Sequence, residues 1–137
     1  MRAVLDSNVL ISAAITQGPA HRIVQAWLER GSFELVVCRS LLDEVTTVLV
    51  DRDSMRRWIS TRDARLYVER LSTTADVSED PGSGPPLTRD RDDDVVVYLA
   101  RENDADLIVS GDADLLGWPE QRPPVVAPAE FERLLNQ

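Results

Sequence analysis

Two short apolar runs in this chain each lead directly to an acidic residue. Ala3-Val4-Leu5 stops at Asp6, and Leu107-Ile108-Val109 is followed by Ser110-Gly111-Asp112. Runs of this length, bounded by polar residues, are typical of strands that are buried on both faces of a sheet. A chain built on such strands folds into a covered sheet, and its acids then lie where the strands end.

Segments with helical spacing alternate with the predicted strands. Strands are predicted over residues 2–6, 33–38, 107–109 and 125–126. Helices are predicted over residues 8–15, 20–30, 41–50, 54–59, 62–72, 92–103, 112–116 and 128–135, with Ser40 as an N-cap. Residues 79–91, rich in Pro and Gly, predict a loop. This alternation predicts an α/β fold with a mostly parallel central sheet and helices on both faces.

Length and charge limit the class of protein. The 137 residues fit a single domain, residues 1–137, and 24 acidic against 15 basic residues give a net charge of −9. No apolar stretch approaches the ~20 residues that cross a bilayer, and the N-terminus lacks the pattern of a secretory signal. The single cysteine, Cys38, cannot form an internal disulfide. We expect a cytoplasmic protein without a membrane partner.

Two acids are expected at carboxyl ends of strands. Asp6 follows the first predicted strand, and Asp112 follows the strand over residues 107–109. In open α/β sheets ligands bind at this edge. Each acid also has a simpler interpretation, because Asp6 could only cap the next helix and Asp112 could only belong to an acidic turn.

Two further acids are expected on helices. Around the helix over residues 41–50, Glu44 falls beside the apolar face and Asp43 points away. In the next acidic segment, Asp93 falls within the apolar arc and Asp92 on its edge, so that periodicity does not decide between them. An arginine partner for Glu44, and a solvated helix N-terminus for the triplet that ends at Asp94, are the simpler interpretations.

Four carboxylates from four separate elements are thus predicted at one end of one sheet. Without compensation they would repel one another and their pKa values would rise. Divalent cations remove this repulsion, and a site made of oxygen ligands suits Mg²⁺ or Mn²⁺. The chemistry indicated is metal-assisted hydrolysis of phosphodiester bonds.

The motifs that carry these acids resemble those of PIN-domain ribonucleases. LDSNVLISA is similar to the family's opening, which reads D-T/S-N. RDRDDDVVVYLARENDADLIVSGDADLL is similar to its later signature, an acid on a helix followed by a strand ending in T/S-x-D. The likeness extends to ELVVCRSLLDEVTTVL and to the closing V-x-x-P-x-E-F. Within the family, the chain resembles PIN-family toxins of bacterial toxin–antitoxin pairs, of the VapC type.

This resemblance implies a PIN-like three-layer α/β/α sandwich and a Mg²⁺- or Mn²⁺-dependent endoribonuclease, the toxin of a type II toxin–antitoxin system. It implies catalytic and metal-binding roles for Asp6, Glu44, Asp93 and Asp112, and supporting roles for Asn8, Ser110 and Asp114. In the family the helical acid lies seven residues before a small residue, so that Ala100 selects Asp93 and leaves Asp92 as the fallback. The products would carry 5′-phosphate and 3′-hydroxyl ends.

RNA and protein partners follow from the same resemblance. Residues 51–70 contain more arginines than acids, and the candidate RNA-binding residues are Arg52, Arg56, Arg57, Arg62 and Arg65. An amphipathic helix pair with ordinary surface arginines is the alternative. A cognate antitoxin protein and a homodimer are also implied, and the net charge of −9 favours a basic antitoxin segment. Trp27 and Trp58 are candidate docking residues, which the sequence does not distinguish from core.

Two other functions compete with the nuclease. A phosphatase-like phosphotransfer enzyme also places an acid after its first strand, but such enzymes use a lysine, and this chain has none. The first acid of haloacid dehalogenase-like phosphatases is followed by a second acid two residues later, where this chain has Asn8. The other alternative is a non-catalytic PIN-fold scaffold that binds RNA or protein, against which the four intact acids argue.

Overall fold

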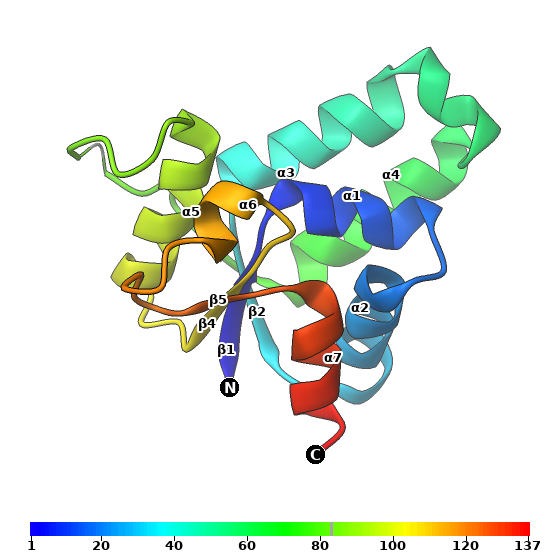
Figure 1. Ribbon diagram of the computed structural model, residues 1–137. Coiled ribbons are helices and arrows are strands. Elements are labelled where there is room, and N and C mark those ends of the chain that lie inside the picture. Colours follow the sequence, from blue (N-terminus) through cyan, green and yellow to red (C-terminus); the bar gives the residue numbers. More distant parts are fainter. Residues whose placement is uncertain (83) are drawn as a thin grey trace.

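The computed structural model describes residues 1–82 and 84–137, and a parallel five-stranded sheet lies at its centre (Figure 1). The strands are β1 (Arg2–Leu5), β2 (Glu34–Cys38), β3 (Asp76–Ser78), β4 (Leu107–Val109) and β5 (Val125–Val126). Their order is β3-β2-β1-β4-β5, and the pairings described are all parallel. The chain therefore builds outward from β1 in one direction and then returns to the other side of β1, which places the switch point between β1 and β4.

Helices cover both faces of this sheet. They are α1 (Ser7–Ile15), α2 (Pro19–Arg30), α3 (Arg39–Thr46), α4 (Thr61–Thr74), α5 (Arg91–Glu102), α6 (Ala113–Leu116) and α7 (Pro128–Leu135). Between α3 and α4 the chain forms a π-helical segment, η1 (Thr47–Asp51), and a 3₁₀ segment, η2 (Asp53–Arg57). Figure 1 shows the end of α3, both short segments and the start of α4 projecting beyond the sheet as an arm. No helix of the described residues is long and apolar enough to span a bilayer.

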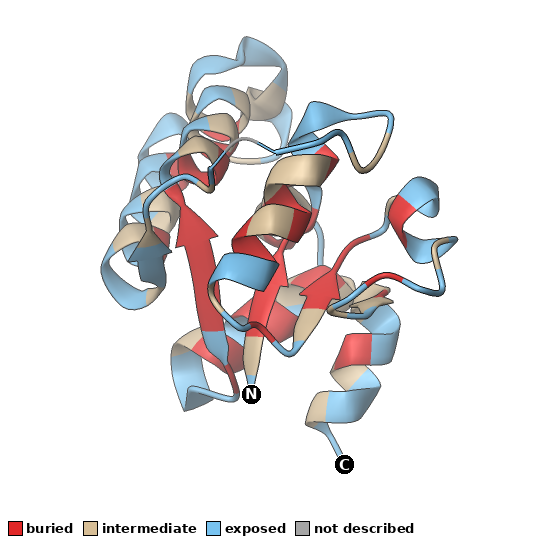
Figure 2. Cartoon of the chain, turned by 90° about the vertical axis from the view of Figure 1, so that its left-hand side faces the viewer, coloured by how far each residue is buried: buried red, intermediate tan, exposed pale blue. Residues whose placement is uncertain are grey.

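Alternate residues of β1, β2, β4 and β5 belong to two separate cores. Leu5, Leu35 and Val109 pack with α1, α2, α4 and α7, whereas Val4 and Ile108 pack with α5 and α6. Both sets are fully or almost fully buried. Figure 2 shows α5 lying across one face of these buried strands. Burial on both faces explains why the strands read as unbroken apolar runs, and it confirms the predicted α/β class with helices on both sides.

Two local predictions differ from the structure. Residues 76–78 were not predicted as a strand, yet they pair with β2 as the edge strand β3, because pairing and not propensity stabilises a segment this short. Ser40 was predicted as an N-cap, but α3 begins at Arg39 with Cys38 as the capping position. The backbone N–H of Ser40 instead donates to the carboxylate of Asp80 at 2.8 Å, so that a side chain distant in sequence satisfies this helix start.

Candidate active site

Asp6 lies at the carboxyl end of β1, directly beside the switch point. It is only 5% exposed, and its backbone N–H donates to the carbonyl of Val109 in β4. One carboxylate oxygen accepts from the backbone N–H of Val9 at 2.9 Å, so Asp6 is the N-cap of α1. The other oxygen accepts from the hydroxyl of Ser110. The capping role and the location at the sheet edge therefore coincide in one residue.

Ser110 links the ends of two adjacent strands. Its side chain is fully buried. The hydroxyl donates to Asp6 and accepts from the backbone N–H of Asp112 at 3.0 Å. Because a hydroxyl both donates and accepts, one side chain fixes the acid after β1 relative to the acid after β4. The predicted supporting position of Ser110 thus has a defined hydrogen-bonding basis.

Asp112 and Asp114 occupy the start of α6. Asp112 is half-buried, and its carboxylate accepts from the backbone N–H of Asp114 at 2.8 Å, which makes it the N-cap of that helix. The side chain of Asp114 is exposed and lies 3.9 Å from the guanidinium of Arg89. Of the two acids, Asp112 faces the other predicted site residues, since its charge raises the pKa of both Asp6 and Asp93.

Asp93 is the most perturbed acid of the group. It is 8% exposed, and its Oδ2 atom is buried without a hydrogen-bond partner among the described residues. Burial, followed by the charges of Asp112, Asp90 and Asp6, raises its pKa to about 7. Asp92 is exposed. The ambiguity that periodicity leaves between the two neighbours is therefore resolved by burial: Asp93 is the acid that faces inward.

Glu44 reaches the same region from α3. It is half-buried, whereas Asp43 is exposed, as the helical wheel predicts. Burial raises the pKa of Glu44, and hydrogen bonding with the buried Ser7 partly offsets this effect. The charges of Asp92 and Asp6 raise its pKa further. Ser7 was not among the predicted site residues, although it occupies the T/S position of the D-T/S-N motif.

One acid near the site was missed by the sequence analysis. Asp90 belongs to the segment predicted as a loop, yet it is the N-cap of α5 and accepts from the backbone N–H of Asp92 at 2.9 Å. Its charge raises the pKa of both Asp93 and Glu44. An Asp two residues before the predicted helix start was the available signal.

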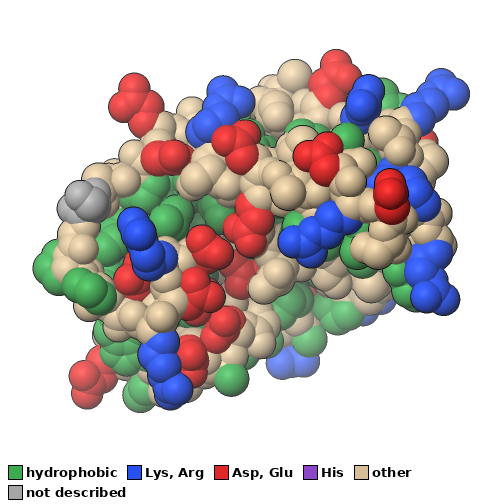
Figure 3. All heavy atoms as spheres, turned by 90° about the horizontal axis from the view of Figure 1, so that it is seen from above, with side chains coloured by type: hydrophobic (Ala, Val, Ile, Leu, Met, Phe, Trp, Pro, Cys, Tyr) green, Lys and Arg blue, Asp and Glu red, His purple; other side chains and the backbone are tan. Residues whose placement is uncertain are grey.

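Acidic side chains gather on the face formed by the carboxyl ends of the strands, with arginines around them (Figure 3).

This acidic group fits a divalent cation in its chemistry, although its side chains do not yet form a cage. Over residues 1–82 and 84–137, no group of three His, Cys, Asp or Glu side chains is arranged so that it could hold a metal ion. The donors are all oxygen atoms, their charges oppose one another, and one buried oxygen of Asp93 is unpaired. These are the conditions that a hard cation relieves.

Asn8 contributes through its backbone. Its side chain is exposed and makes no hydrogen bond with another described residue, while hydrogen bonding from its backbone helps to lower the pKa of Asp6. An orienting role for the Asn8 side chain stays a prediction.

The predicted RNA-binding arginines divide into two groups. Arg56 is half-buried, and its guanidinium donates to the carbonyls of Leu49, Val50 and Arg52 and to the hydroxyl of Thr61. These contacts close the end of η1. The other four arginines are exposed on the arm: Arg52, Arg57, Arg62 and Arg65.

The two tryptophans proposed for docking also differ. Trp27 is 5% exposed and belongs to the core beneath α2, so it does not offer a docking surface. Trp58 is 57% exposed, and the guanidinium of Arg57 lies over its ring at 5.2 Å.

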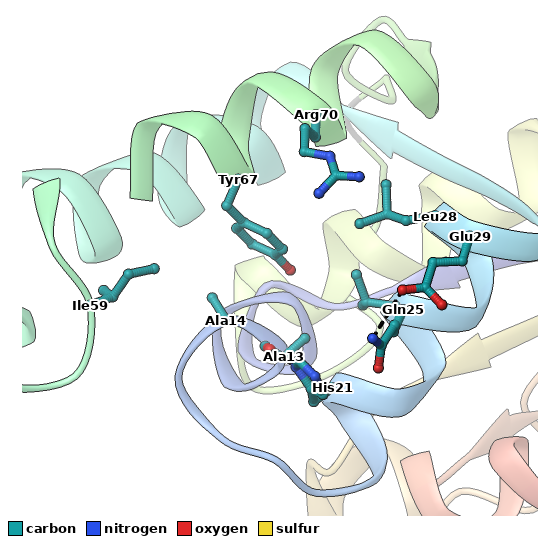
Figure 4. A pocket seen from close by; sticks show the side chains of 10 residues that line it. Ala13, Ala14, His21, Gln25, Leu28, Glu29, Ile59, Tyr67 and Arg70 are labelled. Atoms are coloured by element: carbon teal, nitrogen blue, oxygen red, sulfur yellow. Dashed lines mark hydrogen bonds between the residues drawn. The ribbon is translucent and has the colours of Figure 1, made fainter. Parts of the chain in front are cut away.

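A separate hollow of about 240 Å³ lies between α1, α2 and α4 (Figure 4). The residues described around it include none of the four predicted acids. Two of its polar groups are paired within the chain: the hydroxyl of Tyr67 donates to the carbonyl of Leu10 at 2.6 Å, and Nδ1 of His21 lies 3.0 Å from the carbonyl of Ala13. His21, the single histidine, therefore helps to join α1 to α2 and stands apart from the acidic face.

Comparison with known proteins agrees with this architecture. A family model described as PIN domain matches residues 2–114. No curated protein matches the sequence. The chain is similar in fold to PAE2754 from Pyrobaculum aerophilum, with a TM-score of 0.64, 16% identity, and coverage of 99% of this chain and 90% of that one.

Two further solved structures share the fold. The crystal structure of VapBC2 from Rickettsia felis, bound to a DNA fragment from their promoter, gives a TM-score of 0.63 at 8% identity over 93% of this chain and 98% of that one. The PIN domain of human SMG5 gives a TM-score of 0.51 at 12% identity over 98% of each chain. At these identities the likeness concerns the fold.

Proposed function

The chain belongs to the PIN-domain family, and on this premise we propose that it is a metal-dependent endoribonuclease that hydrolyses phosphodiester bonds of RNA. The observation that carries the proposal is the buried, unpaired carboxylate oxygen of Asp93 among acids from other elements. A fold that only needed stability would not keep this arrangement, since desolvating like charges together is unfavourable.

The acids have distinct roles in this proposal. Asp6, Asp93 and Asp112 would hold Mg²⁺ or Mn²⁺, with Glu44 binding at the edge of the group. When bound, such an ion lowers the pKa of water and offsets the negative charge that develops on the phosphate. Ser110 holds Asp6 and the backbone of Asp112 in register, so that two of these acids are oriented before substrate arrives.

Asp93 makes this centre sensitive to pH. With a pKa of about 7, its carboxyl group holds a proton in a substantial fraction of the cation-free protein at neutral pH. A cation must displace that proton, so that affinity for the metal rises with pH. Asp6 behaves in the same sense, because burial raises its pKa while the bonds from Ser110 and Val9 lower it.

We further propose that the protein is the toxin of a type II toxin–antitoxin pair, acting in the cytoplasm. The support is the similarity in fold to VapBC2 together with the motifs quoted above. Its partners would be an RNA substrate, a cognate antitoxin and a second copy of the chain. A net charge of −9 favours an antitoxin whose contacting segment is basic, because opposite charge accelerates association.

The test is cleavage of total RNA by purified protein, freed of any antitoxin, with Mn²⁺ or Mg²⁺. Wild-type protein should produce fragments with 5′-phosphate and 3′-hydroxyl ends. Asp6→Asn and Asp93→Asn should each lower the rate by about 100-fold or more, because loss of an outer-shell partner alone costs ~10–100-fold. Asp43→Asn is the matched control, since Asp43 is an exposed acid that points away from the site.

Two results would contradict the proposal. Metal-dependent cleavage that survives both substitutions would place the centre elsewhere. Absence of cleavage with every divalent metal would favour the second candidate, a non-catalytic scaffold that binds RNA or protein. The scaffold has one observation in its favour, namely that no three of the described acids are already arranged around a common point.

A further inference from the structure

A second hollow opens beside the acidic residues. It measures about 380 Å³ and is lined by Leu87, Thr88, Arg89, Asp114 and Trp118. This volume lies in the range of small-ligand sites. Its walls come from the segment before α5 and from the region of α6, the two places where the chain also supplies Asp90 and Asp112.

Residues that line the hollow are connected to acids of the candidate active site, one through the chain and one through a hydrogen bond. Arg89 directly precedes Asp90, the N-cap of α5. On the other wall, at the start of α6, the backbone N–H of Asp114 donates to the carboxylate of Asp112 at 2.8 Å. The guanidinium of Arg89 lies 3.9 Å from the carboxylate of Asp114, so the two walls face each other. A ligand in the hollow would therefore lie next to the acids and not at a remote surface.

One wall of the hollow is held in place by the side chain of Asp94. Its carboxylate accepts from the backbone N–H of Thr88 at 2.7 Å, from the hydroxyl of Thr88 at 2.7 Å and from the backbone N–H of Leu87 at 3.3 Å. Asp94 is the last acid of the triplet for which a solvated helix N-terminus is the simpler interpretation, yet its carboxylate is fully engaged with this wall. Three hydrogen bonds to one carboxylate fix the backbone of Leu87 and Thr88, directly before Arg89. This wall is therefore formed before any ligand binds.

The opposite wall presents an aromatic ring. Trp118 follows Gly117, the C-cap of α6, and its backbone N–H donates to the carbonyl of Leu115 at 3.2 Å. Trp118 is half-buried and lines the hollow. Arg89 is 90% exposed in its side chain, and its contact with Asp114 is long, which leaves the guanidinium available to a ligand.

An aromatic ring, an apolar side chain and a free guanidinium next to acids select a particular occupant. A phosphate group inside the hollow would be repelled by Asp114, whereas the face of a nucleobase carries no charge and stacks on tryptophan or arginine. We propose that this hollow binds an unpaired nucleobase of the RNA strand beside the scissile phosphate, with Trp118 as the stacking platform and Arg89 contacting the backbone of the adjacent nucleotide. This inference rests on the proposed ribonuclease function.

The test measures binding of short single-stranded oligoribonucleotides to Asp93→Asn protein, which keeps the substrate uncut. Trp118→Leu keeps an apolar side chain without a stacking ring and should weaken binding by about tenfold. Trp118→Phe should restore most of the affinity. Leu116→Ala is the control, because Leu116 is a neighbouring exposed residue of α6 outside the hollow.

Removing the partner of the ring gives the second arm of the test. An abasic residue is placed at each position of the oligoribonucleotide in turn. At one position the abasic residue should weaken RNA binding as much as Trp118→Leu does. Combining that abasic oligoribonucleotide with the Trp118→Leu variant should weaken binding no more than either change alone. Wild-type affinity in Trp118→Leu, or equal losses in the Leu and Phe variants with no sensitive position, would overturn the inference.

Cleavage assays in the otherwise wild-type protein separate the two proposals. RNA cleavage that keeps its rate and its sequence preference in Trp118→Leu overturns the base site and leaves the ribonuclease intact. The opposite outcome is binding that depends on Trp118 and on one base in a protein that shows no RNA cleavage with any divalent metal. That result supports the base site and contradicts the ribonuclease proposal.

Discussion

At the scale of single residues, Asp6, Asp90 and Asp112 each begin a helix and also contribute charge to one region. Each accepts a backbone N–H of its own helix. The dipole of a helix is favourable for a carboxylate at the helix N-terminus, which partly offsets the repulsion between neighbouring acids. Asp93 has no such bond on its Oδ2 atom within the described residues, and burial together with the charges of Asp112 and Asp90 raises its pKa to about 7.

This difference predicts how stability changes with pH. The pKa of Asp93 rises from 3.8 to about 7 on folding, so the folded state holds the proton more tightly, and the free energy of unfolding decreases as pH rises through this window. Asp93→Asn does not titrate. In cation-free protein we expect the variant to be more stable than wild type by ~1–2 kcal/mol at pH 8, and to have no advantage below pH 4.

Urea unfolding at pH 4 and pH 8 with a chelator measures this effect. Asp43→Asn should show no such crossover, since its carboxyl group is exposed. Adding Mn²⁺ at pH 8 should stabilise wild type more than Asp93→Asn. An equal change of stability at both pH values would mean that Asp93 is not held against other charges in the folded protein.

At the scale of elements, the arm between α3 and α4 depends on one arginine. The guanidinium of Arg56 donates to three carbonyls at the end of η1 and to the hydroxyl of Thr61 at the start of α4. It thereby satisfies backbone acceptors that a helix end leaves unpaired. Its neighbour Arg57 instead lies over the exposed ring of Trp58. The two adjacent arginines thus differ in role: Arg56 stabilises the arm, and Arg57 is exposed and can contact RNA.

We expect Arg56→Ala to lower the free energy of unfolding by about 1–3 kcal/mol, because it leaves carbonyl groups without partners. Arg57→Ala, the matched control one residue away, should cost less than about 1 kcal/mol. Chemical denaturation measures both values, and hydrogen exchange of residues 47–61 locates the change. Similar small losses in the two variants would show that the Arg56 contacts do not stabilise the arm.

At the scale of the whole molecule, a protein of net charge −9 is expected to bind a polyanion. Its acids gather on the face at the carboxyl ends of the strands, and arginines lie around that group (Figure 3). The exposed arginines of the arm project beyond the sheet, so they can contact phosphates at a distance from the acids. Attraction at the arm and cation binding at the centre would then act on different parts of one RNA strand.

This arrangement predicts a salt dependence. Replacing Arg57, Arg62 and Arg65 together with Ala should weaken RNA binding at low salt and reduce the slope of log K against log salt by roughly 2, since each phosphate contact with a single strand contributes about 0.7. A control variant replaces Arg30 and Arg133, exposed arginines on α2 and α7. Binding titrations over a range of salt concentrations measure the slope, and an unchanged slope would exclude the arm as an RNA contact.

Local patterns in the sequence determined the strands β1, β2, β4 and β5, most helices, and the half-inward position of Glu44, because burial on one or both faces leaves a regular spacing of apolar residues. Periodicity alone did not decide between Asp92 and Asp93. Local patterns did not reveal β3, the contribution of Asp90 or the structural role of Arg56. Each of these depends on a specific contact, namely a strand pairing, a nearby charge or a hydrogen bond to a backbone carbonyl. Such contacts leave no regular spacing of apolar residues in the sequence.

The sequence by itself placed acids at the ends of strands and helices, since capping and periodicity act over a few residues. The alternation of strands and helices also predicted that these acids gather at one end of a parallel sheet, but only the tertiary structure decided which of them are buried and how they are linked. The order β3-β2-β1-β4-β5 brings β4 beside β1, and the buried hydroxyl of Ser110 then joins Asp6 to the backbone of Asp112 across 104 residues of chain from Asp6 to Ser110. Strand order arises from packing two cores against one sheet, and no short stretch of sequence encodes it.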